Sequence, residues 1–489
     1  MRAQRWRTSP PEVNPPVADR LSPLDASFLY LESPTTAMHV GSVGVFDPPP
    51  GGLDFHALQD LVADRIAFVP RYRQRVRQVP GRLANPVWVD DEDFDITYHV
   101  RRSALPRPGT RAQLEEFVAR IQSRRLDRTR PLWELYVVEG LEDGRWAMVT
   151  KTHQAMVDGV HAVDIGQVVL DADPEPTDAP PGSWQPAPEP SDLELVAGAV
   201  AEALGRPSAV VETLRTGLGD VRSSATRAAG SALRIARVAA RSAPTSPLNA
   251  PIGEARRFVT VDTSLDDYRR VRKAHGSSVN DVVLATVTGA LRAWLMTRGE
   301  SVKGASTVRA LVPVSVRHGE APAPGDGWAD AQSGGFDVGN RLSAVVVDLP
   351  IGEPSPVMRL HQVAYQMRAH SESGQAVAAD TLAGVAGFAP PTLHGLAARV
   401  ANGLSARLFN LVVTNVPGPQ VPLYAGGARM VSAYPVTPLA AGQAVAVALT
   451  SYDGGVFYGL NADRDAMPDV AVLGQCLLDA LAELVDTVR

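Results

Sequence analysis

The chain has 489 residues, 45% of them hydrophobic and 20% charged, which is typical of a globular protein and long enough for two domains. The formal net charge of -6 argues against a nucleic-acid-binding protein, and a single cysteine, Cys476, excludes an internal disulfide. No run of about 18 apolar residues is present, so any membrane contact would be peripheral. Residues 1–20 are rich in Pro and Arg and lack the apolar segment of a secretory signal. Together these features predict a cytoplasmic protein.

A first domain is expected over residues 21–173, after a flexible N-terminal arm at 1–20. Period-two and helical patterns of apolar residues predict its elements in chain order. They are a strand at 40–46, helices at 53–69 and 111–124, strands at 135–141 and 146–152 and a helix at 162–170. The two last strands are separated by Glu142-Asp143-Gly144, a composition typical of a hairpin turn.

Residues 174–248 are expected to link two domains. Residues 174–190 are dense in proline, and residues 191–243 are rich in alanine and favour helix. Between residues 204 and 243 there are seven arginines against two acidic residues. This segment is either a solvated linker helix or a basic segment that rests on an anionic lipid surface.

A second domain is expected over residues 249–489. Its predicted elements are a strand at 256–262, helices at 265–274 and 279–297, strands at 310–316 and 341–349, a helix at 354–371, strands at 411–415, 445–451 and 456–461 and a helix at 468–488. Strands and helices are mixed without a repeat, which predicts an α/β (α+β) protein. The chain has neither a glycine-rich phosphate loop nor a GxSxG nucleophile motif.

The segment at residues 151–160, KTHQAMVDGV, is the strongest candidate for a site, because polar residues gather where an apolar strand ends and a helix is expected. Asp158 could orient a ring or bind an arginine there. Gly159 permits a backbone turn that a side chain would obstruct.

HQAMVDG resembles the HHxxxDG signature of the chloramphenicol acetyltransferase-like fold. Further segments resemble, in the same order, the motifs of the wax ester synthase/diacylglycerol acyltransferase family, in its actinobacterial form. They are LSPLDASFLYLESPTTAMHVGSVGVFD at 21–47, PLWE at 131–134, LNAPIG at 248–253, RRF at 256–258, NDVVLA at 280–285, VPVSVR at 312–317, GNRLS at 339–343 and TNVPGP at 414–419. The resemblance covers roughly residues 21–485.

The resemblance implies two chloramphenicol acetyltransferase-like domains with mixed sheets, flanking helices and a substrate tunnel between them. It implies transfer of a long-chain acyl group from acyl-CoA to diacylglycerol or a fatty alcohol, which is triacylglycerol or wax ester synthesis. No cofactor is implied, since acyl-CoA is a substrate. Contact with the inner membrane or with lipid droplets is a further expectation. In the family mechanism the second histidine of the motif removes the proton of the acceptor hydroxyl.

Gln154 occupies the position of that second histidine. A carboxamide is too weak a base for the task, although it can hydrogen-bond a hydroxyl or an oxyanion. Either His153 is the base, or the substitution is an inactivating change, or the chain is a natural member with altered activity. If the strand continues through 152–154, His153 points away from the tunnel, which favours a core histidine. His161 would lie too far along a helix to substitute directly.

The resemblance and the local patterns also indicate other site residues. Asp158 is expected to hold the loop, through Arg317. Asn280 and Asp281 either cap a helix or face the substrate. Asn415 either holds a turn or donates to an acyl carbonyl, and Pro131 and Trp133 are expected either in the core or near the tunnel mouth. The histidines show no metal-ligand spacing. Two alternative functions remain open, namely an inactive relative that binds acyl-CoA or lipid, and an enzyme with a non-lipid acceptor.

Overall fold

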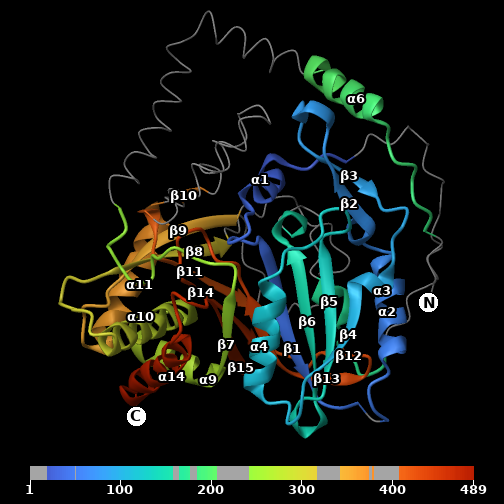
Figure 1. Ribbon diagram of the computed structural model, residues 1–489. Helices are drawn as coiled ribbons and strands as arrows, with labels where there is room; N and C mark the ends of the chain where they lie inside the picture. Colours follow the sequence, from blue (N-terminus) through green and yellow to red (C-terminus); the bar gives the residue numbers. More distant parts are fainter. Residues whose placement is uncertain are drawn as a thin grey trace, which may run out of the picture.

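The computed structural model describes residues 19–49, 51–157, 165–176, 184–205, 242–315, 342–373, 377–378 and 407–488. They form two lobes side by side, each with a mixed sheet and flanking helices (Figure 1). The predicted fold class is therefore confirmed. In the described part of the chain, none of the helices combines the length and the apolar composition needed to cross a bilayer.

Six strands form the first sheet. In spatial order they are β12 (Tyr424–Ala425), β13 (Ala428–Val436), β1 (His39–Phe46), β6 (Trp146–His153), β5 (Trp133–Glu139) and β4 (Val100–Ala104). Neighbouring strands are antiparallel except β4 and β5. A separate hairpin pairs β2 (Gln74–Arg77) with β3 (Val87–Asp90). The helices of this lobe are α1 (Pro23–Leu31), α2 (Phe55–Ile66), α3 (Ile96–His99), α4 (Arg111–Gln122), α5 (Ile165–Val169) and α6 (Asp192–Gly205).

The helix predicted at 111–124 is α4, which ends two residues earlier than expected. Its start is fixed by a capping box, in which the Thr110 side chain accepts from the Gln113 N–H while the Gln113 side chain accepts from the Thr110 N–H. Leu114, Phe117 and Val118 are buried along one face. A stripe of this kind, at helical spacing, drives the packing of a helix against a sheet.

Seven strands form the second sheet. In spatial order they are β10 (Val377–Ala378), β9 (Leu342–Leu349), β8 (Val308–Ser315), β11 (Leu411–Pro417), β14 (Val445–Tyr452), β15 (Gly455–Asp463) and β7 (Arg256–Ser264). The pairs β8–β11 and β11–β14 are parallel and the others antiparallel. The helices of this lobe are α9 (Leu265–His275), α10 (Val279–Thr297), α11 (Pro356–Ser373) and α14 (Val470–Asp486).

The predicted helix at 279–297 has the observed bounds of α10. Ser278 caps it by accepting a hydrogen bond from the Asp281 N–H at 3.1 Å. From Asp281 to Leu291 every residue is buried, so this helix is surrounded by other elements rather than lying on the surface. Its apolar character on all sides is what a central helix requires.

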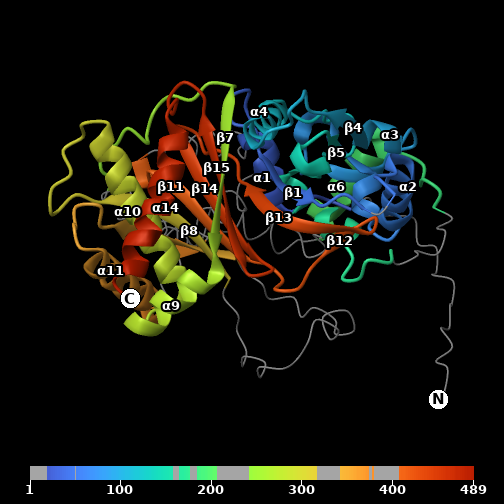
Figure 2. The same ribbon diagram turned by 90° about the horizontal axis from the view of Figure 1, so that it is seen from below.

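One prediction about domain boundaries needs correction. Strands β12 and β13 come from the segment assigned to the second domain, yet they pair in the first sheet, where β13 is antiparallel to β1. Figure 2 shows β13 running from the second lobe into the first. The boundary at residue 249 therefore does not separate the two sheets, because the second half of the chain contributes two strands to the first sheet.

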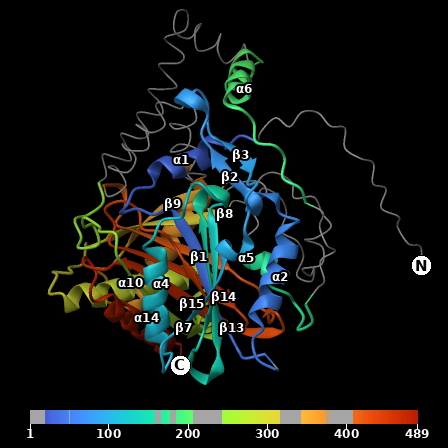
Figure 3. The same ribbon diagram turned by 45° about the vertical axis from the view of Figure 1, so that its right-hand side comes forward.

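The two lobes also meet through α4 and β7, which lie next to each other in Figure 3. The Glu115 carboxylate of α4 accepts from the backbone N–H of Thr260 at 2.7 Å and from its hydroxyl at 2.6 Å. Arg256, at the start of β7, donates to the backbone oxygen of Thr35 in the first lobe. These polar contacts set the orientation of the first sheet relative to the second.

Gly459 lies at a second close approach between the two lobes, that of β15 to β13. A Cβ at this position of β15 would clash with the carbonyl oxygen of Pro435 in β13. We expect Gly459→Ala to lower the free energy of unfolding by about 1–3 kcal/mol through overpacking. Urea denaturation measures this value. The control is Gly198→Ala in α6, where a Cβ meets nothing within 4 Å and no loss is expected. Equal stability of both variants would contradict the close approach.

Some predicted segments fall outside the described residues, and some observed elements had no predicted counterpart. The helix expected at 162–170 is seen as α5, with residues 158–164 outside the description. Residues 206–241, which hold the seven arginines of the segment at 204–243, also lie outside it, and α6 is the described beginning of the helix-favouring stretch at 191–243. The strands without a predicted counterpart are β2, β3, β4, β10, β12 and β13, and the helices without one are α1 and α3.

Candidate active site

The motif strand β6 lies in the middle of the first sheet between β1 and β5, and all eight of its residues are buried. It ends at His153, and Gln154–Met156 form a single 3-10 turn. The Gln154 N–H donates to the carbonyl of Met38 and the His153 N–H to the carbonyl of Leu132, both at 2.9 Å. The turn is therefore held by the segments that lead into both neighbouring strands.

His153 is completely buried. Its Nδ1 accepts a hydrogen bond from the Ala155 N–H at 3.0 Å and caps the turn. Burial lowers the pKa of His153 to about 3, so the ring is neutral at neutral pH. The Nδ1 lone pair is used in the hydrogen bond from Ala155, and the pKa of the ring lies far below neutral pH. Both features make His153 unsuitable as a general base. This environment is that of the hydrogen-bonded core histidine predicted above.

Gln154 follows directly and its side chain is partly exposed. A buried ring is thus followed directly by a partly exposed residue at the motif position. The other predicted residues of this loop, Asp158 and Gly159, lie outside the described residues, as do His161 and Arg317.

In the second lobe the structure brings Asn280 and Asn415 together, since the Asn415 Nδ2 donates to the Asn280 Oδ1 at 3.2 Å. The two residues come from the start of α10 and from β11, and both are partly exposed. Asp281 is buried, and its carboxylate accepts from the Ser278 N–H at 2.8 Å. Of the two roles predicted for Asp281, the structure supports helix capping.

Pro131 and Trp133 are both buried. The indole N–H of Trp133 donates to the carbonyl of Tyr72 at 2.8 Å, and its ring stacks on His99 with centroids 4.6 Å apart. These contacts place Trp133 in the hydrophobic core of the first lobe. The substrate-binding role considered for Trp133 is therefore not supported, because a fully enclosed ring offers no face to a ligand.

Glu134 and Lys151 form a buried charged pair that no sequence pattern predicted. They lie opposite each other on β5 and β6, with Glu134 Oε2 3.8 Å from Lys151 Nζ. Glu134 also lies 3.2 Å from Arg101 Nη2 and accepts from the Tyr136 hydroxyl at 2.8 Å. The Lys151 ammonium donates to the carbonyls of Ile121 and Arg124. Burial lowers the pKa of Lys151 to about 8.

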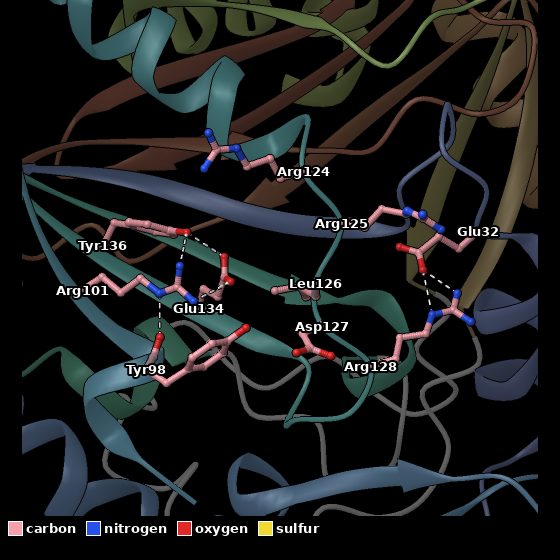
Figure 4. A pocket seen from close by; sticks show the side chains of 10 residues that line it. All are labelled: Glu32, Tyr98, Arg101, Arg124, Arg125, Leu126, Asp127, Arg128, Glu134 and Tyr136. Atoms are coloured by element: carbon pink, nitrogen blue, oxygen red, sulfur yellow. Dashed lines mark hydrogen bonds and ion pairs between the residues drawn. The ribbon is translucent and has the colours of Figure 1, made fainter.

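A pocket of about 520 Å³ opens beside this pair (Figure 4). Four arginines and three carboxylates line it together with two tyrosines and one leucine, namely Arg101, Arg124, Arg125, Arg128, Glu32, Asp127, Glu134, Tyr98, Tyr136 and Leu126. Its charged walls suit a polar or anionic group rather than an alkyl chain. Two of its carboxylates continue inward, Glu134 to Lys151 and Glu32 to His39.

The buried histidines predict a loss of stability in acid. Burial lowers the pKa of His153 from 6.5 to about 3 and that of His99 to about 4. Below about pH 6.5 the unfolded chain binds protons on these rings while the folded chain does not. The free energy of unfolding should therefore fall by about 1.4 kcal/mol per pH unit for each ring as the pH is lowered to about 5.

Urea denaturation at several pH values measures this slope. His153→Asn is the control, since asparagine keeps a side-chain acceptor for the Ala155 N–H but does not titrate. It should reduce the slope by about 1.4 kcal/mol per pH unit. A stability that stays constant from about pH 7 to about pH 5 would show that these rings are not desolvated.

Two family models match the chain. The wax ester synthase/diacylglycerol acyltransferase catalytic domain matches residues 21–283, and the WS/DGAT C-terminal domain matches residues 338–485. The probable diacylglycerol O-acyltransferase tgs2 of Mycobacterium tuberculosis is 35% identical, with 96% of this chain and 99% of that protein covered. The probable diacylglycerol O-acyltransferase tgs1 of the same organism is 34% identical, with 96% of both covered.

Solved structures agree with this relation. The wax ester synthase/diacylglycerol acyltransferase from Marinobacter aquaeolei VT8 superposes with a TM-score of 0.65 at 29% identity, covering 96% of this chain and 99% of that one. The first condensation domain of the calcium-dependent antibiotic synthetase shares the fold, with a TM-score of 0.57 at 17% identity and with 96% and 97% covered. The chain therefore belongs to the wax ester synthase/diacylglycerol acyltransferase family.

Proposed function

We propose that this chain is an O-acyltransferase that moves a long-chain acyl group from acyl-CoA to diacylglycerol or to a long-chain alcohol, at a rate reduced by Gln154. The observation that carries the proposal is the family match over the motif strand, together with an accessible side chain at the first position of the turn that follows it. In the reaction the acceptor O–H bond breaks, its oxygen bonds to the thioester carbonyl carbon, and the C–S bond then breaks. The proton passes to the CoA thiolate.

Gln154 can assist this reaction in two ways without taking the proton. Its Oε1 can accept a hydrogen bond from the acceptor hydroxyl, and its Nε2 can donate to the oxyanion of the tetrahedral intermediate. A positioned imidazole typically contributes about 10²–10⁴-fold through proton transfer, and this contribution is absent. His153 does not replace it, because its ring is enclosed and its Nδ1 caps the turn.

The test measures labelled ester formed from labelled palmitoyl-CoA with hexadecanol and, separately, with a diacylglycerol. Assays without an acceptor give the background hydrolysis of the thioester. Ester formation above this background supports the proposal, and the ratio of the two rates identifies the preferred acceptor. Absence of both esters, from a folded protein that also lacks binding of palmitoyl-CoA in calorimetry, would reject it.

A second candidate is an inactive relative that binds acyl-CoA or lipid. It is favoured by the same residue, since Gln154 cannot act as a base and His153 is enclosed. Binding of palmitoyl-CoA without ester formation would support this candidate over the first.

We also propose that the chain acts at the surface of the inner membrane or of lipid droplets, because the proposed acceptors are lipids. Two large apolar side chains support such contact, Leu83 at 58% and Leu193 at 78% exposure. Co-flotation with vesicles that contain phosphatidylglycerol tests this. Recovery of all of the protein in the vesicle-free fraction would contradict it.

A further inference from the structure

A row of buried polar side chains leads from the motif to the charged pocket. His39 of β1 is the register partner of His153 in β6, and their rings meet edge to face with centroids 5.9 Å apart. On the far side, His39 Nε2 lies 3.1 Å from Glu32 Oε1. The second oxygen of Glu32 accepts from Arg128, whose Nε lies 2.9 Å away (Figure 4). Glu32 and Arg128 line the pocket, so the row ends there.

The contacts indicate where the proton of each ring lies. His153 Nδ1 accepts from the Ala155 N–H at 3.0 Å, so the proton of this neutral ring is on Nε2. His39 Nε2 lies 3.1 Å from a carboxylate oxygen, so its proton is on Nε2 as well. The Leu126 N–H also approaches this nitrogen, but at 3.4 Å, which is a weaker contact.

The remaining nitrogen of one ring is a hydrogen-bond donor, and the remaining nitrogen of the other is an acceptor. His153 Nε2 carries a proton and His39 Nδ1 carries a lone pair, and both atoms, like Glu32 Oε1, are buried without a geometric hydrogen-bond partner among the described residues. A buried polar atom left unpaired costs about 1–3 kcal/mol. Two imidazoles joined by an N–H···N bond have centroids about 5 Å apart. The observed centroid distance of 5.9 Å is longer than this, so the rings are neighbours that are not hydrogen-bonded to each other in the structure.

The charge state of the row agrees with this assignment. Burial is the main cause that lowers the pKa of both His39 and His153, so both rings are neutral. Burial raises the pKa of Glu32, but the hydrogen bond with His39 and the charges of neighbouring side chains, Arg128 among them, outweigh it and lower that pKa. A permanent carboxylate therefore stands at the outer end and accepts the first proton of the row.

We propose that Glu32 and His39 are positioning residues, which keep the proton of His153 on Nε2 and so leave Nδ1 free to cap the turn that carries residue 154. The Ala155 N–H donates to His153 Nδ1 at one end, and His39 Nε2 lies 3.1 Å from Glu32 Oε1 at the other, with the two rings in edge contact between them and no hydrogen bond joining them in the structure. If His153 changed tautomer, its Nδ1–H would face the Ala155 N–H, and the turn would lose its cap. The effect on acyl transfer rests on the proposed function, whereas the tautomer does not.

The tautomer can be observed directly in the full-length protein labelled with nitrogen-15 histidine, by long-range proton–nitrogen correlation. His153→Asn assigns the signals. We expect the wild-type ring to show one protonated nitrogen, Nε2, without titration from about pH 8 to about pH 5.5. Protonation on Nδ1 in the wild-type protein would overturn the proposal, whatever the variants do.

Two substitutions of Glu32 then separate control of the His153 tautomer from a purely structural role of Glu32. In Glu32→Leu, His39 loses its acceptor and is free to move its proton to Nδ1 and to accept from Leu126. His39 would then face His153 donor to donor, so the His153 signal should leave the pure Nε2–H form. Glu32→Gln keeps an acceptor oxygen and should preserve it. An unchanged His153 tautomer in Glu32→Leu would overturn the proposal.

His39→Phe gives a second way to break the row, because it keeps a planar ring and removes both nitrogens. It too should leave His153 in a mixture of tautomers, and a pure Nε2–H form there would count against the proposal. In a Gln154→His background, Glu32→Leu should lower kcat about tenfold with little change in KM for palmitoyl-CoA. Glu32→Gln should retain most of the rate. If Gln154→His itself is inactive, the tautomer measurements still test the positioning role of Glu32 and His39. A failure of the proposed function is therefore distinguishable from a failure of this proposal.

Discussion

Gln154→His is expected to raise the rate of ester formation at least about tenfold and up to about 10²–10⁴-fold, because it places an imidazole at the accessible first position of the turn. The measurement is the initial rate with labelled palmitoyl-CoA and either hexadecanol or a diacylglycerol. The gain should appear in kcat, since proton removal stabilises the transition state rather than the bound substrate. The rate of the histidine variant should also rise with pH as its imidazole becomes neutral.

Gln154→Asn is the matched control for this substitution. It keeps a carboxamide and alters the local packing, but provides no base, so no gain is expected. Equal and robust activity of the wild-type chain and Gln154→His would show that position 154 does not supply the base. His153→Ala would then be the next variant to assay. If neither form makes ester while both bind palmitoyl-CoA, the binding-protein alternative is the better explanation.

Glu134→Ala is expected to lower the free energy of unfolding by about 3 kcal/mol, because it leaves the Lys151 ammonium buried without its carboxylate. Lys151 is 1% exposed at its side chain, and Arg101 loses the same partner. Urea denaturation near neutral pH measures the loss. Above about pH 8 the loss should become smaller, since burial has already lowered the pKa of Lys151 to about 8 and the neutral amine needs no counter-charge.

The double variant Glu134→Ala, Lys151→Met tests the cause of this loss. Methionine fills a similar volume without a charge, and replacing both members of a buried pair is often neutral. We expect the double variant to recover most of the stability that Glu134→Ala loses. A double variant that is less stable than Glu134→Ala would show that the carbonyl contacts of Lys151 matter more than its pairing with Glu134.

Much of the fold follows from local patterns in the sequence. The bounds of α10 and the start of α4 were predicted because apolar spacing and capping residues are contained within one helix. The strand at 146–152 was predicted one residue short of β6, since its first four residues are apolar and a turn signal precedes it. The place of Gln154 in the motif likewise follows from the sequence, because it depends on residue identity alone.

The tertiary structure decided what depends on contacts between distant segments. Strands β12 and β13 join the first sheet although they follow most strands of the second sheet in the sequence, because strand pairing is not limited by distance along the chain. His39 and His153 become neighbours through the register of β1 and β6, and Glu134 and Lys151 through that of β5 and β6. The sequence by itself determined the family and the residue at the motif position to which the family resemblance assigns the base. The buried environment that keeps His153 neutral comes from the sheet, since desolvation depends on what surrounds a side chain rather than on its neighbours in sequence.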